Sequence, residues 1–196
     1  MTIQEVSKNV PKIVGTFLVN KPFVVAPSFE LQRFIGNLFS QSLYQINVEK
    51  NFSKEGLIKG ANKAIISSAY CIKNQKWDAY SNVATNELVI NLSEEMNKKC
   101  NEERQMLEKL LDIASFEENI KKTIIFSTLF TGDKIFNRKE KSKVDFHAAF
   151  VSYIKNPDDP RNNYYCNIGV SRRVYPLGKW KITGVNFFDD KFATQF

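Results

Sequence analysis

The stretch VDFHAAFVSYI, Val144–Ile154, decides the fold class because its side chains alternate in character. Val144, Phe146, Ala148, Phe150 and Ile154 alternate with Asp145, His147, Ala149 and Tyr153. A period of two is the pattern of a β-strand with one buried face. Three more segments read as strands: Thr123–Phe136, YYCNIGVSRRVY (Tyr164–Tyr175) and WKITGVNFF (Trp180–Phe188). The turn-forming stretches NPDDPRNN and PLGK separate the last three of these four strands, which indicates hairpins.

The residues before this sheet have the helical period instead. Ser53 is placed to cap a helix with Leu57, Ala61, Ile65 and Ile72 on one side. KNQKWD (Lys73–Asp78) breaks that helix, a further helical region is expected from Asp78 to about Met96, and EERQMLEKLLDI (Glu102–Ile113) continues it. Helices followed by hairpin-linked strands predict an α+β fold, with helices on one face of an antiparallel sheet.

The N-terminal part divides into an arm and an amphipathic helix. Residues 1–27 contain three prolines, which favours an extended arm. A helix is expected from Ser28 as N-cap to about Ile46, within residues 28–50, and the α+β domain is expected to occupy residues 51–190. This helix has one broad apolar face. We favour packing of that face on the domain, and the alternative is a helix that docks on a membrane surface or a partner.

The charge is concentrated in the sheet half. The chain carries 28 basic and 21 acidic residues, for a net charge of +7. Residues 134–181 contain eleven basic and four acidic residues, which accounts for the whole excess. The basic residues that we expect to meet a partner, an anionic membrane or RNA are Arg138, Lys139, Lys141, Lys143, Arg172 and Arg173. The alternative is a solvated hairpin without a partner.

Motifs for catalysis or metal binding are missing from the sequence. It has three widely spaced cysteines and one histidine, so we predict a reducing compartment, no metal site and no cofactor. No apolar run approaches the length of a membrane-spanning helix. His147 and Asp145 share one side of their strand and are the conceivable acid–base pair, although a surface role is the favoured interpretation. We therefore predict that the protein is not an enzyme.

Arg172 and Arg173 lie on the same predicted hairpin as Tyr164, Tyr165 and Tyr175. This mixture of cations and rings is typical of an RNA-facing sheet, but aromatic residues in strands more often serve ordinary packing.

A family resemblance adds to this interpretation. The segments NFSKEGLIKGANKAIISSAYCIKNQKWDAYSNVATNELVINL (Asn51–Leu92), NIKKTIIFSTLFTGDKIF (Asn119–Phe136) and GKWKITGVNFF (Gly178–Phe188) resemble the domain family of subunit forty-four of the mitochondrial inner-membrane translocase. Within that family, they are most similar to the proteins that interact with the matrix AAA (m-AAA) protease. The resemblance implies a cone-like curved sheet related to nuclear transport factor two. It also implies a structural corner at Trp77 and Asp78, with Trp180 in the last strand.

The function implied by the resemblance is that of a non-enzymatic matrix adaptor, peripherally associated with the inner membrane. Its expected partners are the m-AAA protease and newly imported inner-membrane proteins, whose sorting or maturation it would assist. The nearest alternative is a protein of the large mitochondrial ribosomal subunit, or a tether between ribosome and membrane. A small pocket enzyme using His147 and Asp145 is the third possibility. The first fifteen residues contain Glu5 and no arginine, a poor match to a mitochondrial presequence.

Overall fold

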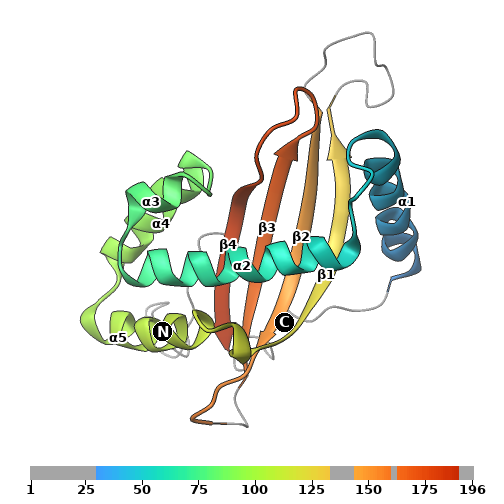
Figure 1. The fold of residues 1–196 in the computed structure, drawn as a ribbon. Helices are drawn as coiled ribbons and strands as arrows, with labels where there is room; N and C mark the ends of the chain where they lie inside the picture. Colours follow the sequence, from blue (N-terminus) through green and yellow to red (C-terminus); the bar gives the residue numbers. More distant parts are fainter. Residues whose placement is uncertain (1–29, 133–143, 160–162, 190–196) are drawn as a thin grey trace, which may run out of the picture.

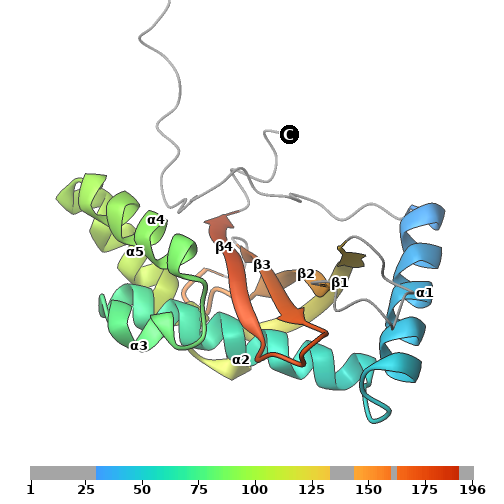
Figure 2. The same ribbon diagram turned by 90° about the horizontal axis from the view of Figure 1, so that it is seen from above.

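The computed structural model describes residues 30–132, 144–159 and 163–189, which form helices packed on a four-stranded antiparallel sheet (Figure 1). The strands are β1 (Ile120–Thr131), β2 (Asp145–Ile154), β3 (Tyr164–Arg173) and β4 (Lys181–Asp189), and neighbours in sequence are neighbours in the sheet. The sheet is curved and open, with β1 at one edge and β4 at the other (Figure 2). The predicted α+β class is confirmed.

The helices are α1 (Leu31–Asn47), α2 (Lys54–Lys73), α3 (Trp77–Ser81), α4 (Asn86–Lys98) and α5 (Asn101–Ala114). Helix α2 crosses one face of the sheet, α3 to α5 gather beyond the β4 side, and α1 lies beside β1 (Figures 1 and 2). A 3₁₀ turn, Glu117–Asn119, leads from α5 into β1.

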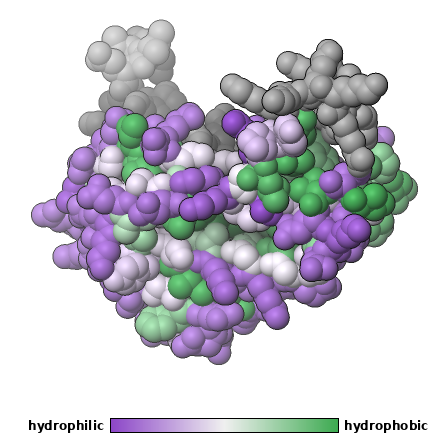
Figure 3. Space-filling view, turned by 45° about the horizontal axis from the view of Figure 1, so that its top comes forward, coloured by the Kyte–Doolittle hydropathy of each residue, from purple (hydrophilic) through white to green (hydrophobic). Residues whose placement is uncertain are grey.

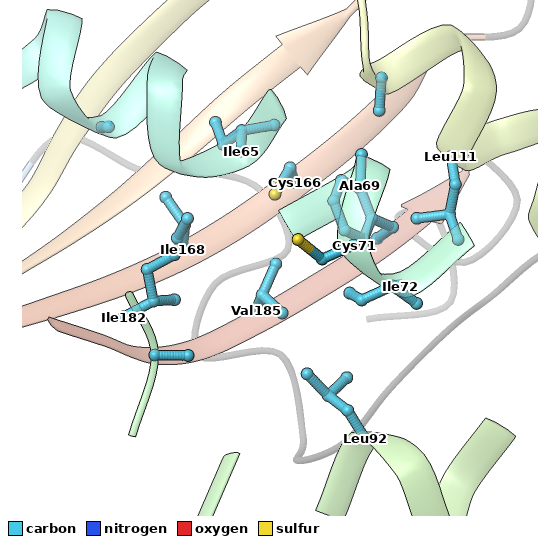
Figure 4. Packing of buried hydrophobic residues seen from close by; sticks show 14 of the residues in the cluster. Ile65, Ala69, Cys71, Ile72, Leu92, Leu111, Cys166, Ile168, Ile182 and Val185 are labelled. Atoms are coloured by element: carbon cyan, nitrogen blue, oxygen red, sulfur yellow. The ribbon is translucent and has the colours of Figure 1, made fainter. Parts of the chain in front are cut away.

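The core lies between α2 and the sheet, as the alternation in β2 predicts. Phe150 pairs in register with Ile168, which pairs with Val185 in β4. All three side chains are buried in one cluster with Ile65 and Ile72 of α2. Figure 4 shows Ile168 and Val185 of the sheet beside these two helix residues. Cross-strand neighbours on one face stabilise a sheet jointly with the helix that covers them.

Helix α2 begins where the sequence predicts. The Ser53 hydroxyl accepts a hydrogen bond from the Gly56 amide at 3.0 Å, which satisfies one of the free donors of the first turn. The helix ends near Gln75, whose backbone has a φ of 52°. The expected break at KNQKWD is therefore confirmed.

The prediction of one continuous helix from Asp78 to Met96 is wrong. It divides into α3 and α4, because Val83–Thr85 pair with the edge of β4 instead of continuing the helix. The Ile182 amide donates to Val83 O at 2.8 Å, and the Thr85 amide donates to Ile182 O at 2.9 Å. Because β4 lies far along the chain, this pairing leaves no signal in the spacing of apolar residues between Asp78 and Met96.

A glycine on α2 yields a testable prediction. A Cβ added to Gly60 would meet no heavy atom within 4 Å, whereas one added to Gly56 would lie 3.0 Å from the Ser53 Oγ that caps the helix. Gly60→Ala is therefore expected to raise the free energy of unfolding by about 0.5–1 kcal/mol, and Gly56→Ala by less. Urea denaturation of both variants measures the difference, and an equal gain in both would contradict it.

Candidate docking surface

The middle of α1 contacts the sheet edge through polar side chains. The Asn37 side chain accepts from the Thr128 amide at 2.7 Å and donates to Phe126 O at 3.1 Å. The Ser40 hydroxyl donates to Thr128 O at 3.0 Å. Asn37 thus bonds to the outer edge of β1 as a neighbouring strand would, which protects part of an exposed edge.

The apolar side of α1 faces away from the sheet. Residues two positions apart on a helix are rotated by about 200°, so they point in nearly opposite directions. Ile35 and Phe39 lie two positions from Asn37, and Ile46 lies two positions from Tyr44, both of which contact the sheet. The large apolar side chains of α1 that are exposed are Leu31, Phe34, Ile35, Leu38, Phe39 and Ile46, with exposed fractions of 49–72%. We call Leu31, Ile35, Phe39 and Ile46 the outer face of α1; it lies in the apolar area at the right of Figure 3. Phe34 and Leu38 flank it on the side of β1.

The expectation that this face packs on the domain is therefore wrong. The helix begins at Leu31 and its N-cap residue is Glu30, which makes no side-chain cap. The expected cap, Ser28, lies outside the described residues. Periodicity predicts an apolar face, but it cannot tell which of two faces meets the sheet. The sequence signal for the observed orientation was the pair Asn37 and Ser40, two polar residues at a spacing that lets both contact the edge of the sheet.

Tyr44 anchors the C-terminal half of α1. Its ring is fully buried, with its centroid 4.4 Å from that of Phe146, 4.7 Å from Phe52 and 6.2 Å from Trp180. Aromatic pairs at these distances stabilise beyond their buried area. We call Tyr44, Phe52, Phe130, Phe146 and Trp180 the aromatic cluster.

Arg172 closes the aromatic cluster on its polar side. Its guanidinium donates to the Tyr44 hydroxyl at 3.0 Å, to Glu49 Oε2 at 2.9 Å and to Gly178 O at 2.7 Å. Its side chain is 16% exposed. Arg172 therefore joins α1, the loop before α2 and the β3–β4 turn, and it is engaged within the molecule.

The predicted basic surface is divided by the structure. Arg173, next to Arg172 on β3, points to the opposite side of the sheet, because successive side chains of a strand alternate. It pairs with Asp145 at 3.5 Å and is 45% exposed. The other four residues of that prediction, Arg138, Lys139, Lys141 and Lys143, lie outside the described residues.

The tyrosines of the predicted RNA-facing group are also separated. Tyr164 packs against the core below α2. Tyr165 lies on the other side of the sheet, edge-on to Tyr153 and stacked on Phe188, with ring centroids 5.2 and 5.5 Å away. Tyr175 is exposed in the β3–β4 turn. The described residues do not gather these rings and arginines on one surface.

At the predicted structural corner, Trp77 is the first residue of α3 and packs against the core, while Asp78 is exposed. Tyr80 is fully buried there, and its hydroxyl is 2.8 Å from that of Ser68. Trp180 lies in the aromatic cluster. A lone tyrosine in a short helix gives no sequence signal of this role.

His147 and Asp145 lie on the side of the sheet away from α2. His147 Nε2 is 2.8 Å from the Thr131 hydroxyl, and Asp145 pairs with Arg173. Neither residue lines the cavity beside the N-terminal half of α2, the groove beside α1 or the cavity between α2 and α5.

A cavity of about 450 Å³ lies between the N-terminal half of α2 and the ends of β3 and β4. Gly56, Gly60 and Ala64 line it at intervals of four residues, where glycine has no side chain and alanine only a methyl group, and Val170 and Ile182 line it from the sheet. Lys63, Lys181 and Glu49 also line it. The Lys181 ammonium donates to Ser81 O and Asn82 O, at 2.9 and 3.0 Å, which holds α3 against β4.

A buried phenol and a buried thiol lead us to predict that the protein loses stability at alkaline pH. Burial raises the pKa of the Tyr80 phenol and the Cys166 thiol well above their ordinary values of 10.0 and 9.0. Above about pH 9–10 the unfolded chain has lost protons that the folded chain still holds, so the free energy of unfolding falls as the pH rises. Below this range both states hold the protons and the effect is absent.

Urea denaturation at about pH 7 and pH 10.5 measures this dependence. Tyr80→Phe removes one of the two groups, so it should lose less stability between the two pH values than the unmodified chain. An equal loss in both proteins would contradict the assignment.

None of the described helices combines the length and apolar character needed to cross a bilayer. Across the described ranges, no cluster of three or more side chains is suited to hold a metal ion. Comparison with protein-family models, curated proteins and solved structures found no match to this chain. The resemblance to the translocase domain family, and the cone-like likeness that it implies, therefore stay predictions.

Proposed function

We propose that the protein is a non-enzymatic adaptor on the matrix side of the mitochondrial inner membrane, to which it attaches through the outer face of α1. We further propose that the protein binds the m-AAA protease and newly imported inner-membrane proteins. The location and these partners rest on the family resemblance. The attachment rests on one observation, the apolar helix face that points away from the sheet.

The attachment is energetically reasonable. Burying a whole aliphatic or aromatic side chain contributes about 1.5–3 kcal/mol, so a side chain that is half exposed would gain roughly 1 kcal/mol on entering an apolar environment. Leu31, Ile35, Phe39 and Ile46 together would support a reversible attachment of the kind made by interfacial helices. α1 carries one charged residue, Arg33, so apolar burial is expected to dominate and the binding to survive moderate salt.

Co-sedimentation with vesicles of neutral and anionic phospholipids tests the attachment. Ile35→Asp combined with Phe39→Asp is expected to lower the partition onto vesicles at least tenfold, because it removes apolar area and introduces charge. Ile90→Asp combined with Phe116→Asp is the matched control, since those side chains are also about half exposed but lie on other elements. Equal binding by both double variants would refute attachment through α1.

The partners require a second experiment. A tagged chain recovered from gently solubilised mitochondria should bring down the m-AAA protease with little ribosomal protein. Recovery of the large ribosomal subunit, lost as the salt concentration rises, would replace the proposal with a ribosome tether. Recovery of neither would refute the adaptor function.

A further inference from the structure

A groove of about 480 Å³ separates the first half of α1 from the first half of β1. In Figure 1 the two elements approach each other near the C-terminal end of α1 and diverge toward its N-terminal end. Phe34 and Leu38 line the α1 side, Ile58 lines the α2 side, and Lys122–Phe126 form the edge of the sheet. The volume lies within the range of natural ligand clefts.

The sheet edge in this groove is open. Asn37 satisfies the outer backbone groups of Phe126 and Thr128. Lys121 lies at a bulge and Lys122–Ile125 pair with β2, and no other described residue hydrogen-bonds to the backbone of this segment. Alternate amides and carbonyls of an edge strand point outward, so this segment can pair with a further strand.

The charge of the groove selects an acidic ligand. Arg33 is already engaged, because it pairs with Glu30 at 3.0 Å and its guanidinium lies 4.2 Å from the ring centre of Phe126. Lys54 and Lys122 also line the groove, and within the described ranges neither has a carboxylate partner. These two lysines come from α2 and from β1, so carboxylates on either face of an added strand would meet a cation.

We infer that this groove binds an extended acidic segment of a partner protein, which adds to the sheet as a strand beside Lys121–Ile125. Backbone pairing with β1 supplies the recognition common to strand-addition sites. Lys54 and Lys122 receive the carboxylates, and Phe34 and Leu38 contact the apolar side chains. About five residues of the segment fit along this edge. The inference deepens the proposed function, because such a site would hold a client or protease segment.

The test uses the full chain, without membranes, and fluorescent ten-residue peptides in which valine alternates with glutamate or with lysine. The glutamate peptide is expected to bind with a Kd of about 100 µM, and the lysine peptide at least tenfold more weakly. Two further glutamate peptides are N-methylated at alternate backbone amides, one at the odd positions and the other at the even positions. One of the two should bind at least tenfold more weakly than the unmethylated peptide, because its methyl groups replace the amide hydrogens that face β1.

Lys54→Glu combined with Lys122→Glu should weaken the glutamate peptide at least tenfold and strengthen the lysine peptide. Lys59→Glu combined with Lys109→Glu makes the same charge change at exposed positions outside the groove and should leave the preference for glutamate intact. The thermal unfolding of both double variants shows whether each is folded. The gain in lysine-peptide binding cannot come from unfolding.

Equal binding of the two peptides, an effect of N-methylation in neither register, or no binding at a peptide concentration of ~1 mM would each overturn the inference. Its failure is distinct from failure of the proposed attachment. Ile35→Asp with Phe39→Asp changes residues that do not line the groove, so it should abolish vesicle binding and spare peptide binding. The reverse pattern is expected for Lys54→Glu with Lys122→Glu.

Discussion

Phe146→Ala is expected to lower the free energy of unfolding by about 3–5 kcal/mol. The Phe146 side chain is fully buried at the centre of the aromatic cluster, with its ring centroid 4.4 Å from that of Tyr44, 5.0 Å from Phe130 and 6.0 Å from Trp180. Removing the ring leaves a cavity between α1 and the sheet, and the rigid neighbours can fill little of it. The loss is a large part of the 5–15 kcal/mol typical of a domain.

Urea denaturation measures this loss. If Phe146→Ala does not fold, Phe146→Leu keeps part of the volume and should still show a smaller loss. Leu129→Ala, one position from Phe130 on β1 but 44% exposed, is the control and should cost much less. A similar loss for Phe146→Ala and Leu129→Ala would show that the aromatic cluster does not hold the fold together.

Arg172→Met is expected to cost about 1–3 kcal/mol, more than any other single change of a charged residue in the described sheet. The substitution keeps the apolar stem but removes three hydrogen bonds, to Tyr44, Glu49 and Gly178. Glu49 is 45% exposed, so water can solvate it again, which keeps the cost below that of a fully buried ion pair.

Arg173→Met is the matched control, because Arg173 is the next residue, carries the same charge and is 45% exposed beside Asp145. Its exposed ion pair should contribute less than about 1 kcal/mol. Hydrogen exchange should localise the Arg172→Met effect, with faster exchange in Leu43–Asn47 at the end of α1. Equal destabilisation by the two substitutions would mean that Arg172 does not anchor α1.

The contacts that hold α1 against the sheet also bear on function. Tyr44 and Arg172 fix one end of α1, and Asn37 fixes its middle, while the outer face takes no part in these contacts. The helix can therefore present apolar side chains without depending on them for its position. If attachment uses a preformed helix in this way, Arg172→Met should weaken vesicle binding although Arg172 is not part of the outer face.

Many elements were predictable because their signals are local. The alternation in Val144–Ile154, the Ser53 cap and the break at Lys73–Asp78 each depend on neighbouring residues, and the structure confirms all three. The division of the Asp78–Met96 helix was not predictable in this way. It depends on hydrogen bonds between Val83–Thr85 and Ile182, which are distant in sequence.

The outer face of α1 shows the same difference between what local sequence predicts and what distant contacts decide. The sequence by itself determined that a helix with one apolar face lies between Ser28 and about Ile46, close to the observed Leu31–Asn47, since the 3.6-residue period is a property of the local chain. Only the tertiary structure decided that this face points outward, because Asn37 and Ser40 bond to the free edge of β1. Likewise, Arg172 and Arg173 are equivalent in the sequence. The alternation of β3 places one in the aromatic cluster and the other beside Asp145, because packing across the sheet assigns each side its neighbours.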